Sequence, residues 1–145
     1  MSTAAAKQHG LLKAMRQMKV DWEPLEFATA ERNGVPLLRG IDEIQTVLDD
    51  HISKTQAIRS SPFCKPFEEE VHAWEATLMY IQDFIDQVIA LQRSWMALEP
   101  IFASDDIKRQ LPQESESFAR IDSNFRMRMA QVDSNKRLRK GNKDE

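Results

Sequence analysis

The side chains of His51, Cys64 and His72 could in principle supply metal ligands, and that of Cys64 could be a nucleophile. Their spacing matches none of the patterns typical of zinc sites, which bring four such ligands together from close pairs. A nucleophilic cysteine needs a neighbouring base, and the sequence places neither histidine to act as one. We therefore expect Cys64 to be a small buried side chain, and the two histidines to flank apolar helix faces and be partly exposed.

Acidic residues occur in two runs, Asp49-Asp50 and Glu68–Glu70. Neighbouring residues on a helix point in different directions, so neither run forms a converging pair of catalytic carboxylates. The second run instead suits the first turn of a helix, where the helix dipole favours negative charge. None of the four glycines lies in a phosphate-binding loop motif. The sequence therefore predicts no enzyme active site, no cofactor and no metal.

The length, composition and net charge of the chain further limit the class of protein to which it can belong. A chain of 145 residues, 41% hydrophobic and 30% charged, is typical of one helical domain or a piece of one. The net charge of −3 gives no overall attraction to nucleic acid. No apolar run approaches the roughly 18 residues that a membrane span needs. We expect neither a nucleic acid nor a membrane as a partner.

Both ends of the chain are basic. Residues 1–20 have no acidic residue and predict an amphipathic helix, although a mitochondrial transit peptide has the same composition. Residues 131–145 predict a basic, frayed tail, which suits either a solvated helix end or a nuclear localisation or nucleic-acid patch.

The middle of the chain predicts one small hairpin among helices. Asn33-Gly34 suits a tight turn with positive φ, between strands over 25–30 and 35–38. Pro36 cannot donate to a strand ladder, so the second strand should lie at an edge. A helix should follow over 41–59 and end before Pro62, because the residue before a proline is disfavoured in a helix.

The longest predicted helix runs from Pro66 to Glu99, about 50 Å at 1.5 Å per residue. Its apolar residues recur at alternating steps of four and three, and Gln92 is the one polar member of this stripe. We expect Pro100 to end it. A short helical turn capped by Ser104 and a last helix from near Pro112 should follow.

These elements predict a mainly α fold: an elongated antiparallel helical bundle with one long central helix and a small β-hairpin near residues 25–38. The residues that we expect to form its core are Trp22, Ile44, Leu48, Ile52, Phe67, Val71, Trp74, Leu78, Ile81, Ile85, Val88, Trp95, Phe118, Ile121 and Phe125.

Several ordered motifs between about Trp22 and about Met129 carry a family resemblance. They are LLRGIDEIQ, LDDHISKTQ, SPFCKPFEEEV, the Trp74-Glu75 pair, QRSW, LEPIF, SDDI and LPQES followed by Phe118. In these motifs the chain resembles the tail-proximal part of the linker region of dynein heavy chains. The residues of the motifs are more similar to those of axonemal than of cytoplasmic heavy chains. It departs from the family at Val88-Ile89, where a tryptophan is usual, and at Met96-Ala97.

The resemblance implies a mechanical role for residues 21–130, as a partial linker domain. A dynein linker is an arched stack of helical bundles that joins the tail to the ring of AAA+ ATPase modules and bends and straightens as the ring changes state. The implied partners are the remainder of a heavy chain, with its linker and ring, and dynein intermediate or light-intermediate chains. The implied location is the cytoplasm and cytoskeleton, in the axoneme of a cilium or flagellum. The alternative is a free-standing helical module that binds a dynein subunit or another partner.

Overall fold

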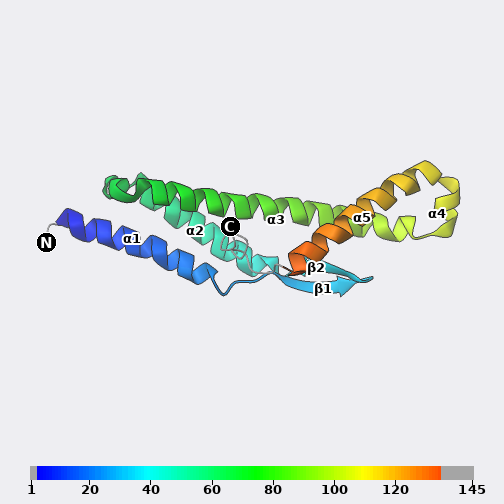
Figure 1. Cartoon of the computed structure of the whole chain (residues 1–145), viewed down its shortest axis with the longest axis horizontal. Coiled ribbons are helices and arrows are strands. Elements are labelled where there is room, and N and C mark those ends of the chain that lie inside the picture. The colour runs from blue at the N-terminus through cyan, green and yellow to red at the C-terminus, as the bar shows by residue number, and fades with distance from the viewer. Residues whose placement is uncertain (1–2, 135–145) are drawn as a thin grey trace.

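A computed structural model describes residues 3–134, and its longest element is α3, Glu68–Phe102, an unbroken helix of 35 residues. At 1.5 Å per residue this helix is about 52 Å long. α2 (Ile41–Ser60) runs antiparallel along its first half and is joined to it by the 3₁₀ helix η1 (Pro62–Phe67) (Figure 1). The predicted mainly α fold with a long helix and a small hairpin is confirmed.

α1 (Thr3–Trp22) packs against α2 and η1 at the same end of the molecule. Its buried residues are Met15, Met18 and Trp22, which recur at steps of three and four and so lie on one face. The hydroxyl of Thr55 on α2 lies 3.8 Å from the sulfur of Met18, inside this contact. α1, α2 and the first half of α3 thus form one half of the bundle.

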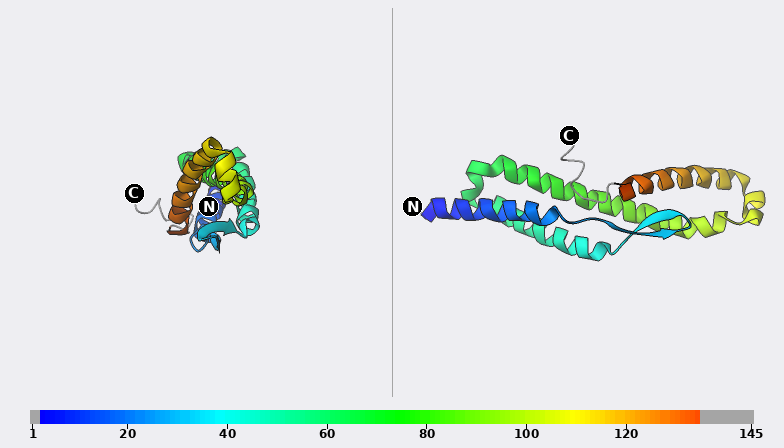
Figure 2. Two further views of the ribbon diagram at one scale, coloured as in Figure 1. Left: turned by 90° about the vertical axis from the view of Figure 1, so that its right-hand side faces the viewer. Right: turned by 60° about the horizontal axis from the view of Figure 1, so that its bottom comes forward.

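The second half of the bundle contains the hairpin and the last two helices. β1 (Ala28–Arg32) and β2 (Val35–Arg39) pair antiparallel, and α4 (Asp105–Gln110) leads into α5 (Pro112–Ser134). α5 folds back over the second half of α3 and contacts β2. The end-on view of Figure 2 shows that the bundle is narrow, and the other view shows the hairpin and α5 beside the second half of α3. α3 is therefore the one element shared by both halves.

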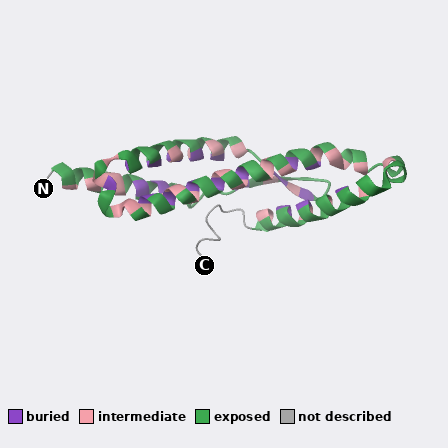
Figure 3. Ribbon diagram, turned by 90° about the horizontal axis from the view of Figure 1, so that it is seen from above, coloured by how far each residue is buried: buried purple, intermediate pink, exposed green. Residues whose placement is uncertain are grey.

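Burial follows the faces that the elements turn to one another (Figure 3). Ile52, Phe67 and Val88 are only half-buried. Ile121 is 46% exposed, against the expectation that it lies in the core, because it lines an open recess between α5 and the end of α3. The other residues expected in the core are all buried: Trp22, Ile44, Leu48, Val71, Trp74, Leu78, Ile81, Ile85, Trp95, Phe118 and Phe125.

Two predicted helix boundaries, the start and the end of α3, differ from the observed ones. Pro66 lies inside η1, so α3 begins two residues later, at Glu68. Pro100 does not end α3, which continues to Phe102. Pro100 has no N–H to donate to the Met96 carbonyl, and the helix continues past it for only two residues, Ile101 and Phe102. Ser104 precedes α4 but makes no side-chain cap.

The structure describes only part of the two predicted terminal segments, residues 1–20 and 131–145. α1 extends past residue 20 to Trp22, and α5 includes residues 131–134. The rest of the predicted basic tail, residues 135–145, lies outside the described residues.

Candidate functional site

The hairpin is fastened to α3 through the side chain of Gln92. The Leu38 backbone N–H donates to Oε1 of Gln92 at 2.8 Å, and Nε2 of Gln92 donates to the Leu38 carbonyl at 3.0 Å. Gln92 is buried, so both hydrogen bonds lie in the core. The side-chain amide satisfies the backbone of β2 in the way that a third strand would.

A second contact joins α3 to α5. The indole N–H of Trp95 donates to the Asp122 carboxylate at 2.7 Å, and Nε of Arg126 donates to both oxygens of the same carboxylate at 3.0 Å. The Arg126 guanidinium lies 5.7 Å from the centre of the Trp95 ring, and the Phe125 ring stacks on Trp95 with its centre 5.1 Å away. We call Trp95, Asp122, Phe125 and Arg126 the indole cluster. It combines charge-assisted hydrogen bonds with aromatic packing, so it fixes the spacing between the two helices.

The hairpin is also held at its tip and at its base. At the tip, Nδ2 of Asn33 lies 3.4 Å from the Glu99 carboxylate, and Nη1 of Arg126 donates to the Asn33 carbonyl at 3.4 Å. At the base, the Thr29 hydroxyl donates to the Asp133 carboxylate at 2.9 Å. α5 therefore runs along the hairpin from tip to base, and the hairpin cannot shift along α3 without breaking polar contacts.

At the other end of the bundle, the indole N–H of Trp22 donates to Nδ1 of His51 at 2.7 Å. His51 is buried, against the expectation of partial exposure, because α1 covers this face of α2. Burial lowers the pKa of His51 below its ordinary value of 6.5, with Lys54 adding to the shift and Asp50 and Asp21 opposing it. His51 is thus a neutral acceptor that ties α1 to α2.

The other residues with potential chemistry do not converge. Cys64 is buried in η1, where its sulfur lies 3.6 Å from the Arg59 carbonyl, and His72 is exposed on α3. Asp50 pairs with Lys54, and Glu70 lies near Lys19 of α1. Within residues 3–134, no group of three His, Cys, Asp or Glu side chains is placed to hold a metal ion. In that same range, every helix is too short or too polar to cross a bilayer.

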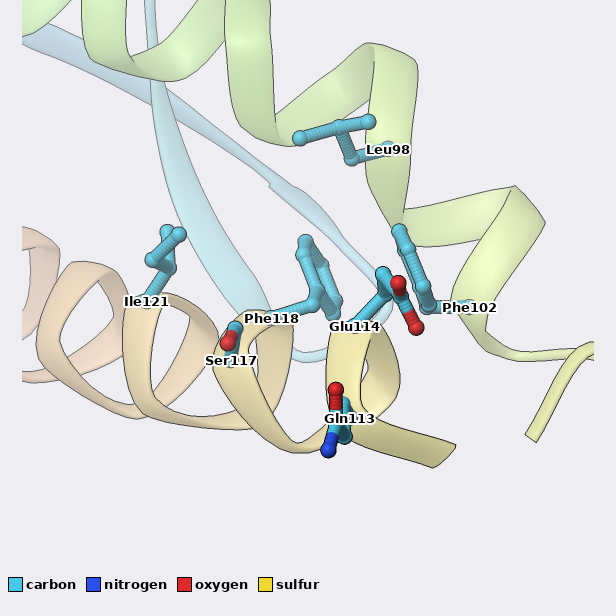
Figure 4. A pocket seen from close by; sticks show the side chains of 7 residues that line it. All are labelled: Leu98, Phe102, Gln113, Glu114, Ser117, Phe118 and Ile121. Carbon is cyan, nitrogen blue, oxygen red and sulfur yellow. The ribbon is translucent and has the colours of Figure 1, made fainter. Parts of the chain in front are cut away.

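A pocket of about 430 Å³ opens between the end of α3 and the start of α5 (Figure 4). The Phe102 and Phe118 rings stack beside it with their centres 5.0 Å apart. Among the described residues that line the pocket, Glu114 is the only ionisable one, and no histidine or cysteine accompanies it. The remaining lining residues are Leu98, Gln113, Ser117 and the exposed Ile121. The pocket is a mainly apolar recess whose lining has none of the groupings that catalysis requires.

The family described as "Dynein heavy chain, N-terminal region 2" matches residues 1–145. This chain belongs to the dynein heavy chain family. It is 45% identical over 128 residues to human dynein axonemal heavy chain 12, covering 87% of this chain and 4% of that protein. It is 39% identical over 140 residues to human dynein axonemal heavy chain 3, covering 95% of this chain and 3% of that protein. Rat dynein axonemal heavy chain 1 is 34% identical over the same length, again 95% and 3%.

This dynein segment therefore spans about 4% of the length of such relatives. It corresponds to part of the N-terminal region of a heavy chain, and residues 1–145 contain no catalytic ATPase domain. Within residues 3–134, its polar side chains join helices and a hairpin to one another. In this part of a dynein heavy chain, the candidate site is a set of contacts that hold the helices and the hairpin together.

The sequence did not predict most of the polar residues that form these contacts. Gln92 was visible as the single polar residue in an apolar stripe, and such a residue predicts a buried hydrogen-bond partner. Asp122 and Arg126 were not detectable, since an acidic and a basic residue four apart on a helix usually form an ordinary surface pair.

Proposed function

We propose that this chain is the tail-proximal part of the linker of an axonemal dynein heavy chain. In this role it transmits force between the ATPase ring and the tail during movement along microtubules. The observation that carries the proposal is that α3 is one continuous helix, with α1 and α2 packed at one end and the hairpin and α5 at the other.

A single helix bends easily, and lateral contacts are needed to make it a lever. On the α2 side, the Gln45 and Gln82 side-chain amides bond each other at 2.6 and 3.3 Å, and Arg59 pairs with Glu75 at 2.7 Å. On the α5 side, the indole cluster and the hydrogen bonds of Gln92 supply the lateral contacts. Bending α3 would require neighbouring elements to slide past it, and close packing together with these bonds resists sliding.

The proposed partners are the remaining linker and the ring of the same heavy chain, together with intermediate or light-intermediate chains. The proposed location is the cytoskeleton of the axoneme in a cilium or flagellum. Relatives whose names specify axonemal heavy chains support this location, at 39% and 45% identity.

The test uses a complete heavy chain that carries this segment. Trp95→Ala removes the centre of the indole cluster, and Arg93→Ala on the same turn of α3 is the matched exposed control. We expect ATP hydrolysis by the Trp95 variant to stay near that of the wild type, while the microtubule gliding velocity falls several-fold. Unchanged gliding by a folded Trp95 variant would contradict a role in force transmission.

The second candidate is a free-standing helical module that binds a dynein subunit. The apolar pocket and the exposed Ile101, Leu111 and Ile121 near it favour this alternative. It predicts that the isolated chain melts cooperatively, sediments as one sharp species and binds a dynein subunit. A loosely packed, aggregating species would argue against it.

A further inference from the structure

Five exposed residues of α5 share one side of the helix, next to the face that packs on the core. They recur at steps of three and four residues: Glu114, Ser117, Ile121, Asn124 and Arg128. We call these five residues the α5 stripe. Ile121 lies at the centre of the stripe and is 46% exposed, although burial of a large apolar side chain is favourable. The stripe therefore presents an apolar centre to solvent.

The α5 stripe borders the apolar recess at the end of α3. Glu114, Ser117 and Ile121 line the pocket, and Leu98 and Phe102 form its other wall (Figure 4). Both of these α3 side chains are only half-buried. A helix that lies along the stripe would also cover the recess, so its binding would remove apolar surface of both α3 and α5 from water.

The α5 stripe has opposite charges at its two ends. Glu114 lies seven residues before Ile121, and Arg128 lies seven residues after it. Within residues 3–134, Glu114 makes no ion pair, and Arg128 donates to the uncharged Asn124 at 3.4 Å. Neither end of the stripe therefore has an oppositely charged partner in the described part of the chain.

This arrangement of charges is complementary to a second copy of itself. In an antiparallel pair about a two-fold axis at Ile121, Glu114 of each copy lies beside Arg128 of the other, and the two Ile121 side chains meet at the axis. A parallel pair would bring the two Glu114 side chains together and the two Arg128 side chains together. Like charges across an interface are unfavourable, so the charges select the antiparallel orientation.

Arg120 is a further cation beside the stripe. Its guanidinium donates to the Ser117 hydroxyl at 3.3 Å, four residues before the position of the axis. In the antiparallel pair this guanidinium lies near the uncharged Asn124 of the second copy. Arg120 therefore adds no like-charge contact at the centre of the pair.

We propose that the α5 stripe binds a second copy of this chain, in an antiparallel two-fold pair centred on Ile121. Exposed ion pairs contribute little to affinity, so the apolar surface of Ile121 and the recess supplies the binding free energy and the charges set the orientation. The second copy occupies the surface that the second candidate function gives to a dynein subunit. The role of α3 in force transmission does not depend on this pairing.

Sedimentation equilibrium of the full chain tests the pairing. We expect the wild type to form a reversible dimer as its concentration rises, and Ile121→Asp to raise the dissociation constant of the dimer by tenfold or more, because it places a charge at the centre of the contact. Val20→Ser on α1 is the matched control, since Val20 is 56% exposed and lies outside the α5 stripe. Far-UV circular dichroism should show the same helix content in all three proteins.

A charge swap tests the orientation of the pair without changing its apolar centre. Glu114→Arg alone, or Arg128→Glu alone, makes both symmetric charge pairs repulsive and should weaken the dimer about fivefold. The variant with both substitutions should dimerise as the wild type does. Oxidation provides a second measurement: Ile121→Cys should form a disulfide-linked dimer, whereas Ser117→Cys should not, because position 117 lies on opposite sides of the axis in the two copies.

Three results would overturn the proposal. The first is a wild-type chain that stays monomeric at every concentration. The second is a dimer that Ile121→Asp leaves intact, or one that links through Ser117→Cys in place of Ile121→Cys. The third is a monomeric chain that binds a dynein intermediate chain through Ile121, since a subunit would then occupy the α5 stripe.

Discussion

The indole N–H of Trp22 and the imidazole Nδ1 of His51 form a buried hydrogen bond of 2.7 Å between α1 and α2. Because Nδ1 accepts, the proton of the neutral imidazole is on Nε2. A protonated imidazole carries a hydrogen on both nitrogens, and it would present a donor to the Trp22 donor. This hydrogen bond between α1 and α2 therefore requires a neutral His51.

The first prediction is a loss of stability in acid. Burial lowers the pKa of His51 in the folded chain below 6.5, so the unfolded chain binds more protons as the pH falls. The His51 contribution to stability is thus complete above about pH 6.5 and is lost as the pH drops toward the lower folded-state pKa. His51→Gln keeps an acceptor for the indole but does not titrate. Urea unfolding at pH 5 to 8 should show a smaller acid loss in this variant than in the wild type, and His72→Gln, at an exposed position, should behave as the wild type.

The second prediction concerns Trp74, which is 2% exposed on the inner face of α3. Trp74→Ala should lower the free energy of unfolding by about 3–5 kcal/mol, because it leaves a large cavity between α3 and its neighbours. Tyr80→Ala on the same helix removes a ring that is 72% exposed and should cost less than about 0.5 kcal/mol. Similar losses from the two substitutions in urea unfolding would mean that α3 packs by a different face.

The third prediction tests the fastening of the hairpin. Gln92→Leu preserves an apolar stem but leaves the buried N–H and carbonyl of Leu38 without partners, at a cost of about 1–3 kcal/mol. The Leu38 amide should then exchange much faster with solvent, while the Leu37 amide, which faces β1, should change less. Gln87→Leu at an exposed position of α3 is the control. A Leu38 amide that stays protected in Gln92→Leu would show that another group holds β2.

The fourth prediction concerns the indole cluster. Asp122→Ala removes the acceptor of the Trp95 N–H and the partner of Arg126, so unfolding should become easier by about 1–3 kcal/mol. The NMR resonance of the Trp95 indole N–H should move, whereas those of Trp22 and Trp74 should stay in place. Asp105→Ala, on exposed α4, should move none of them.

Periodicity allowed the helical elements to be predicted, because the stripe from Val71 to Trp95 repeats at the spacing of one helix face. It did not show that Ile121 is exposed, since the side of α5 that meets α3 depends on where the two helices diverge. Proline chemistry predicted that α2 ends shortly before Pro62, and the helix ends at Ser60, one residue past the predicted Arg59. The same reasoning misplaced the end of α3, where Pro100 lies in the last turn. The partners of Gln92 and Asp122 come from distant parts of the chain, and no local pattern encodes them.

α3 passes through both halves of the molecule without interruption, and a helix advances by about 100° for every residue. One extra residue between Ile85 and Gln92 would therefore rotate Gln92, the rest of α3, α4 and α5 by about a quarter turn around the axis relative to α1 and α2. The number of residues in the middle of α3 thus sets the rotation around the helix axis between the two ends of the molecule. It decides toward which side each end presents its surface.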